Sequence, residues 1–217
     1  LAAGDAERAR DLVRDLHPAD VADLLEWLSA DERRGLVEAL RPILNPEILS
    51  ELDDTVREEI ITQLGVQSVA AAVAELDSDD AVEVIEELEE PEQREILDAM
   101  PAVDRTLIEE SLAYPDDSAG RLMQHEVVTV PTFWTVGETI DYMRQSADLG
   151  EKTLPQVFYD IFVVDPMYRP AGTLALSRLL RTRRPVPVSD LMETEMSLIP
   201  AHMDQEEVAF LFRQRDL

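Results

Sequence analysis

The first half of the sequence carries a pair of apolar residues that recurs every twelve positions. The pairs are Leu12-Val13, Leu24-Leu25, Leu36-Val37, Ile48-Leu49, Ile60-Ile61, Ala72-Val73, Val84-Ile85 and Ile96-Leu97. Another apolar residue lies four positions after the first member of each pair: Leu16, Leu28, Leu40, Leu52, Leu64, Leu76, Leu88 and Met100. This spacing places the three side chains on one stripe of a short helix. Each unit is therefore predicted to be one amphipathic helix.

Helix-ending and helix-starting residues separate these units. They are His17-Pro18, Ser29-Ala30-Asp31, Arg41-Pro42, Asp53-Asp54, Gly65, Asp77-Ser78 and Glu90-Pro91. Short helices joined by such short turns bury their apolar stripes only by stacking on one another. The first half is therefore predicted to be a right-handed or otherwise superhelical α-solenoid. A longer similarity aligns Pro18–Leu40 with Ser78–Met100 and pairs Asp20 with Asp80.

Acidic residues dominate the charge of the chain and are unevenly distributed. There are 47 Asp and Glu against 19 Lys and Arg, a formal charge of −28. Residues 1–112 hold 31 acids and 9 bases (−22), whereas residues 113–217 hold 16 and 10 (−6). This balance disfavours nucleic acids and anionic membranes as partners. It suits a solvated surface, and equally a surface neutralised in part by hard divalent cations.

Other compositional features narrow the class of protein. Cysteine is absent, so disulfides and thiolate metal sites are excluded and an intracellular location is favoured. No apolar run approaches the length of a membrane span, and the N-terminus lacks the apolar core of a signal peptide.

The second half has the pattern of an α/β domain. Strands are predicted at Glu126–Val130, which Pro131-Thr132 ends, at Val157–Val164 and at Ala171–Leu176. Helices are predicted over Val136–Arg144 and Ser177–Arg181. The series then begins again with Val188–Met192, a strand near Leu198-Ile199 and a helix over Gln205–Arg213. The predicted fold class is therefore multi-domain, α followed by α/β.

Tyr114-Pro115-Asp116-Asp117-Ser118-Ala119-Gly120-Arg121-Leu122-Met123 joins the two halves and has the proline, aspartates and glycine of a hinge. The stretch from Gly120 to Leu174 resembles a nearly complete CBS motif, and "SDLM" with "MDQEEVAFLF" resembles the start of a second. An acidic helical domain entering a CBS pair through this junction resembles the cytosolic part of MgtE-type magnesium transporters and channels. The resemblance implies a helical domain at 1–112, a hinge at 113–123, a first CBS motif at 124–187 and an incomplete second motif at 188–217.

The resemblance also implies Mg²⁺ ions held between the helical and CBS domains. Carried over by matching motifs, the ligand candidates are Glu47, Asp79, Glu83, the Gly120 backbone, Asp204, Glu206 and Asp216. Magnesium prefers oxygen ligands and keeps several waters, so one or two carboxylates from each side suffice. From the residues alone, Asp79 and Asp204 are equally good helix N-caps, and Glu83 suits a solvated face.

Nucleotide binding is a weaker expectation, because CBS domains often bind adenine nucleotides and the family is reported to bind ATP. Ala175 and Arg178 occupy the positions at which that signature has a hydroxyl and an acidic residue. Arg178 and Arg181 could meet phosphates, although a solvated basic helix end accounts for them better.

Two functions are compatible with the sequence. In the first, the chain is the Mg²⁺-sensing region of a magnesium transporter or channel, on the cytoplasmic side of the membrane, dimeric through its CBS domains and attached to a membrane domain absent here. The alternative is a soluble CBS protein that senses nucleotides and binds a partner through its helical array. No catalytic motif supports an enzyme: His17, His125 and His202 lack a metal-helix spacing, and no glycine-rich phosphate loop is present.

Overall fold

The computed structural model describes residues 3–148, 154, 155 and 157–215, which form two compact units. One unit contains the chain up to Met123 together with the chain from Ala201 onward, and the other is Gln124–Pro200. The start of the predicted second CBS motif is thus divided between the units. A helical array and a small sheet confirm the predicted fold class.

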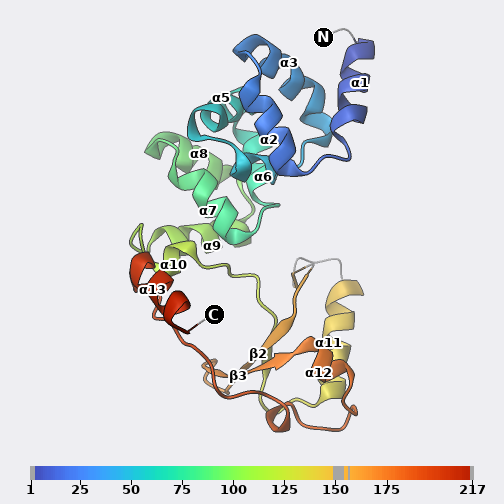
Figure 1. Cartoon of the computed structure of the whole chain (residues 1–217), viewed down its shortest axis with the longest axis vertical. Helices are drawn as coiled ribbons and strands as arrows, with labels where there is room; N and C mark the ends of the chain where they lie inside the picture. The colour runs from blue at the N-terminus through green and yellow to red at the C-terminus, as the bar shows by residue number, and fades with distance from the viewer. Residues whose placement is uncertain (1–2, 149–153, 156, 216–217) are drawn as a thin grey trace. The chain divides into compact units, whose positions relative to one another are not determined.

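The first unit is built almost entirely of short helices (Figure 1). They are α1 (Ala3–Val13), α2 (Pro18–Trp27), α3 (Ala30–Leu40), the 3₁₀ helix η1 (Arg41–Ile43), α4 (Ile48–Glu51), α5 (Asp54–Leu64), α6 (Val66–Val73), α7 (Ser78–Glu86), α8 (Glu90–Ala99), α9 (Ala102–Leu112), α10 (Ala119–Leu122) and α13 (Gln205–Arg215).

Helix boundaries fall at the predicted turn residues because their side chains and backbones satisfy the free ends of the helices. Ser29 and Glu32 form a capping box at the start of α3. The Asp53 carboxylate accepts a hydrogen bond from the Val56 N–H at 2.9 Å. Gly65 ends α5 with φ +79°, a conformation that glycine adopts without the strain of a side chain.

The array has two layers of helices, and each helix packs on its neighbour in the same layer. In one layer α2 packs on α4, α4 on α7 and α7 on α9; in the other α1 packs on α3, α3 on α5, α5 on α6 and α6 on α8. The repeating apolar residues lie between the layers, as predicted from Leu36–Val37 to Met100. Full burial of each such side chain contributes about 1.5–3 kcal/mol, so this stripe supplies most of the stability of the unit.

The first repeat departs from the pattern, as do Leu24, which is 38% exposed, and one tryptophan. Leu12 and Leu16 are 77% and 44% exposed because, among the described helices, α1 packs mainly on α3. Trp27 is 89% exposed, although its position within an amphipathic helix pattern suggests a packing residue. Helical spacing alone does not place Trp27 on the buried side of α2.

The second unit is a three-stranded sheet covered by helices. Strand β1 (Thr129–Pro131) is parallel to β2 (Asp160–Val164), and β2 is antiparallel to β3 (Pro170–Ala175). Helices α11 (Val136–Asp148) and α12 (Leu176–Leu180) and the 3₁₀ helix η2 (Val188–Asp190) complete the unit. Its core contains Val128, Val130, Val136, Ile161, Val163, Leu174, Leu179 and Val188.

Several strand boundaries differ from the prediction. The strand predicted at Glu126–Val130 is shorter and lies at Thr129–Pro131. Pro131 is the last residue of β1 and pairs with Val164, because a proline lacks only the N–H donor and can still end a strand. Strand β2 begins at Asp160 rather than Val157. Within the described residues no strand forms near Leu198, which is 65% exposed.

Candidate metal centre

Helix α7 concentrates the predicted carboxylate ligands of the helical unit. Asp79 and Glu83 are four residues apart and therefore share one face of the helix. The Oδ1 atom of Asp79 is buried and has no hydrogen-bond partner among the described residues. A buried carboxylate oxygen without a donor is unfavourable unless a cation or a water satisfies it. Asp79 thus offers the kind of oxygen that Mg²⁺ binds.

Asp80 is a member of this acidic group that the sequence did not single out. Burial, followed by repulsion from the carboxylates of Asp79, Glu83, Asp77 and Glu51, raises the pKa of Asp80 to about 6. Glu51 ends α4, which packs on α7, so two helices contribute to the negative potential. The only signal for Asp80 in the sequence is its repeat partner, Asp20.

The raised pKa of Asp80 predicts that Asp80→Asn stabilises the metal-free protein at high pH. The folded state binds more protons than the unfolded state between about pH 4 and 6, so ionised Asp80 destabilises the fold increasingly as pH rises through that window. We expect Asp80→Asn to raise the free energy of unfolding by about 1 kcal/mol at pH 8, a value reduced for partial solvent screening, and to have no effect at pH 4. Urea unfolding at both pH values measures this.

Asp20→Asn is the matched control for that experiment. Asp20 is exposed in the first turn of α2, at the position that the sixty-residue similarity aligns with Asp80. We expect it to change stability by less than about 0.5 kcal/mol at either pH. An equal effect of Asp80→Asn on the free energy of unfolding at pH 4 and pH 8 would show that ionisation of Asp80 does not destabilise the fold.

Glu47 lies at the N-cap position of α4 and is exposed. Its carboxylate accepts a 3.4 Å hydrogen bond from the Asn45 side chain, whose own oxygen accepts the Glu47 N–H at 3.0 Å. Glu47 is therefore held next to the surface of α4 by local contacts only, and it remains open to solvent and to ions.

Gly120 and the start of α13 are brought together by backbone hydrogen bonds. The Gly120 N–H donates to the Ala201 carbonyl at 2.7 Å, and the Ala119 N–H donates to the Met203 carbonyl at 2.8 Å. The Gln205 N–H donates to the Asp117 carbonyl at 2.8 Å. Since α10 packs on α7, the predicted ligands of the junction and of α7 lie on contacting elements.

Asp204 and Glu206 are held within this junction. The Oδ1 atom of Asp204 accepts the Glu206 N–H at 2.8 Å, as an N-cap of α13 does. Asp216 lies outside the described residues. Among the residues that the structure describes, no group of three or more His, Asp or Glu side chains is arranged to hold a metal ion. A largely hydrated Mg²⁺ needs only one or two carboxylates from the protein.

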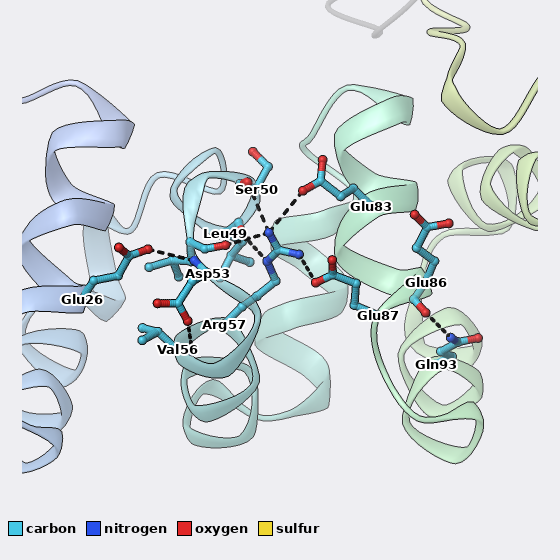
Figure 2. Close-up of polar contacts among 11 residues, drawn as sticks. Glu26, Leu49, Ser50, Asp53, Val56, Arg57, Glu83, Glu86, Glu87 and Gln93 are labelled. Atoms are coloured by element: carbon cyan, nitrogen blue, oxygen red, sulfur yellow. Dashed lines mark hydrogen bonds and ion pairs between the residues drawn. The ribbon is translucent and has the colours of Figure 1, made fainter. Parts of the chain in front are cut away.

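Arg57 is buried beside the predicted ligand Glu83 (Figure 2). Its Nε donates to the Leu49 carbonyl and its Nη2 to the Leu52 carbonyl, both at 2.8 Å. The same Nη2 lies 3.2 Å from a Glu83 oxygen, and Nη1 forms an ion pair with Glu87. Arg57 therefore caps the carbonyl end of α4 and joins it to two carboxylates of α7.

Arg121 makes a second ion-pair network at the junction. It is buried, and it contacts Asp116 at 2.5 Å, Glu86 at 3.4 Å and the Tyr114 carbonyl at 3.0 Å, while its Nε has no hydrogen-bond partner among the described residues. Burial raises the pKa of Glu86, and Arg121 partly opposes this. A hollow of about 600 Å³ beside this network is lined by Glu86, Glu90, Gln93, Leu112, Asp116, Asp117, Arg121, Leu122 and Gln205.

The nucleotide candidates lie on and just after α12. Arg178 is 3.3 Å from Glu193, and both side chains are largely exposed. Arg181 is exposed at the end of α12. None of the described helices combines the length and hydrophobicity that crossing a bilayer requires.

Comparison with known proteins agrees with the fold. Residues 16–117 match the model of the MgtE intracellular N domain. Over 207 residues the chain is 27% identical to the magnesium transporter MgtE of Bacillus subtilis, and over 222 residues it is 28% identical to that of Thermus thermophilus. These alignments cover 95% and 100% of the chain but 45% and 48% of the relatives, so the chain spans about half of their length.

Two solved structures share the architecture. The cytosolic domain of the Mg²⁺ channel MgtE in complex with ATP superposes with a TM-score of 0.85 at 27% identity, covering 99% of this chain and 86% of that one. The soluble part of a magnesium transporter superposes with a TM-score of 0.79 at 21% identity, covering 99% and 82%. At that identity the second structure supports the fold alone.

Proposed function

Since residues 16–117 match the MgtE intracellular N domain, we propose that the chain is the Mg²⁺-sensing regulatory region of a magnesium transporter or channel. The relatives are transporters and channels, and no catalytic role is proposed. Divalent cations are proposed to bridge the carboxylates of the helical array and those that begin the second CBS motif.

The physical basis of this proposal is electrostatic. Residues 1–112 carry a formal charge of −22, and in the absence of cations the carboxylates of α4 and α7 repel one another and those near Asp204. A cation that binds between them stabilises the arrangement in which they are close, because a ligand shifts an equilibrium only through its higher affinity for one state. In the intact protein, the family resemblance implies that this compact state closes the ion pathway.

The observation that carries the proposal is the buried Oδ1 of Asp79, which no described donor satisfies. It lies on α7, which packs on α10, and the backbone of α10 binds the segment that precedes α13. Asp80 adds a further sign of excess negative charge, since its pKa is raised to about 6. Cation binding would relieve both features.

Mg²⁺ is expected to stabilise and compact the chain through Asp79. At a concentration ten times its dissociation constant, a bound ion adds about 1.4 kcal/mol to the free energy of unfolding. We expect Asp79→Asn to remove most of this increment, whereas Asp23→Asn, an exposed change on α2, retains it. Thermal unfolding and small-angle scattering with Mg²⁺ and with chelator measure both effects. Equal compactness of the wild-type chain in both conditions would refute the proposal.

The remaining features of the intact protein are proposals that rest on the same resemblance. The chain spans about half of its relatives, and we propose that a membrane domain of the same polypeptide follows it. The chain would then lie on the cytoplasmic side of the membrane and associate as a homodimer through its CBS domains.

ATP is the second ligand to test, because the structural neighbour of highest TM-score named above is a complex with ATP. In this chain Arg178 faces Glu193, and Ala175 stands in place of the expected hydroxyl. Titration of ATP after saturation with Mg²⁺ separates the two hypotheses. Binding of ATP without any binding of Mg²⁺ would favour the nucleotide-sensing alternative.

A further inference from the structure

We propose that Arg57 acts as an internal competitor for the metal ligand Glu83 and so sets the Mg²⁺ affinity of the helical unit. This inference rests on the proposed function, in which Glu83 binds the ion. Arg57 would then be a positioning residue that holds Glu83 in the absence of the ion and releases it when the ion binds.

The contacts of Arg57 are unequal in strength, and the contact with Glu83 is the one that can be exchanged. The bonds to the Leu49 and Leu52 carbonyls are short and buried, whereas the Glu83 side chain is 50% exposed and lies 3.2 Å away. Glu87, which is 34% exposed, also pairs with the guanidinium. If Glu83 turns toward an ion, Arg57 keeps one carboxylate and two carbonyls, so its charge stays neutralised (Figure 2).

This exchange has an electrostatic cost that tunes affinity. When a cation binds Glu83, the ion pair between Glu83 and Arg57 is broken. The bound cation is also repelled by the Arg57 guanidinium, which remains close by. Both effects weaken binding relative to a free carboxylate. The site would therefore respond at a higher Mg²⁺ concentration than its many carboxylates alone would suggest.

Arg33 provides a matched comparison within the same array. It occupies the fourth position of α3 as Arg57 does of α5, and its Nε donates to the Leu25 carbonyl at 2.9 Å and its Nη2 to the Leu28 carbonyl at 3.2 Å. It pairs with Glu59 at 2.5 Å. Glu59 is not a ligand candidate, so Arg33 shares the structural role of Arg57 without the proposed competition.

The test compares Arg57→Lys and Arg33→Lys by calorimetric titration of MgCl₂ into the full chain. Lysine keeps the charge but cannot reproduce the planar fork of donors, so it frees the carboxylate. We expect Arg57→Lys to tighten Mg²⁺ binding roughly three- to fivefold, the value of one partly exposed ion pair, and Arg33→Lys to leave it unchanged. Equal changes in both variants, or no change in Arg57→Lys, would overturn the inference.

A second measurement uses the wild-type chain and does not depend on the stability of a variant. In ¹⁵N-labelled protein, Mg²⁺ should shift the guanidinium resonance of Arg57 and leave that of Arg33 in place. An unchanged Arg57 resonance at saturating Mg²⁺ overturns the competition. Absence of any Mg²⁺ binding by the wild-type chain would instead overturn the proposed function itself, so the two failures are distinguishable.

Discussion

Replacement of Arg57 by methionine is expected to lower the free energy of unfolding of the helical unit by about 3–5 kcal/mol, the cost of removing one partner from a buried ion pair. The side chain of Arg57 is only 4% exposed, and its loss leaves the Leu49 and Leu52 carbonyls buried without a donor. Methionine fills much of the volume, so the effect reports the lost polar contacts rather than a cavity. Urea unfolding followed by circular dichroism measures it.

Arg34→Met is the control, because Arg34 makes a short ion pair that is exposed to solvent. It lies 2.7 Å from Asp31, but the two side chains are 66% and 93% exposed. Exposed pairs of this kind contribute about 0–1 kcal/mol, so we expect a change of less than 1 kcal/mol. If both variants lost the same stability, burial would not be the reason for the importance of Arg57.

Gly120→Val is expected to detach the segment before α13 from the helical unit. A Cβ at this position would lie 2.7 Å from ring atoms of Tyr114 and 2.9 Å from the Ala201 carbonyl oxygen, which is closer than real Cβ contacts allow. Because Ala201 also accepts the Gly120 N–H, the backbone cannot retreat without breaking that bond. Overpacking of this size costs about 1–3 kcal/mol, and we expect it to be relieved by release of the segment.

Hydrogen exchange of the amides of Ala119, Gly120 and Gln205 measures this release, since each donates across the junction. We expect their exchange to accelerate at least roughly tenfold, the effect of about 1.4 kcal/mol, while the amides in α5 stay protected. Gly137→Ala is the control, because its Cβ would meet Arg184 atoms at 3.3 Å, a distance that a small adjustment relieves. Unchanged exchange at the junction in Gly120→Val would contradict the close packing.

The helical unit was predictable because its signals are local. Apolar spacing and turn residues act within one or two helices, and the boundaries of α3, α5 and α7 follow from Ser29, Asp53 and Asp77. The predicted burial is wrong at Leu12 and Leu16, because among the described helices α1 packs mainly on α3. The strand boundaries were predicted less well because they depend on which distant segment supplies the pairing partner.

The candidate metal centre was only partly predictable. Asp79 and Glu83 came from resemblance to a family, and their proposed role as ligands stays a prediction. Asp80 and Arg57 were missed because their importance depends on burial and on partners 26 or more residues away, such as Glu51 and Glu83. The available signal for Arg57 was that Arg33 and Arg57 occupy the same helical position.

The way in which the arginines cap preceding helices also bears on the order in which the chain folds. Arg57 closes the carbonyl end of α4 from only five to eight residues further along the chain, and Arg33 does the same for α2. Each helix end is thus completed as soon as the next helix forms, and contacts of short sequence separation form quickly. Pairing of β1 with β2 joins Thr129 to Phe162 and must wait for a longer loop to close. During synthesis, the array that carries the acidic helices would therefore be assembled before the sheet that follows it.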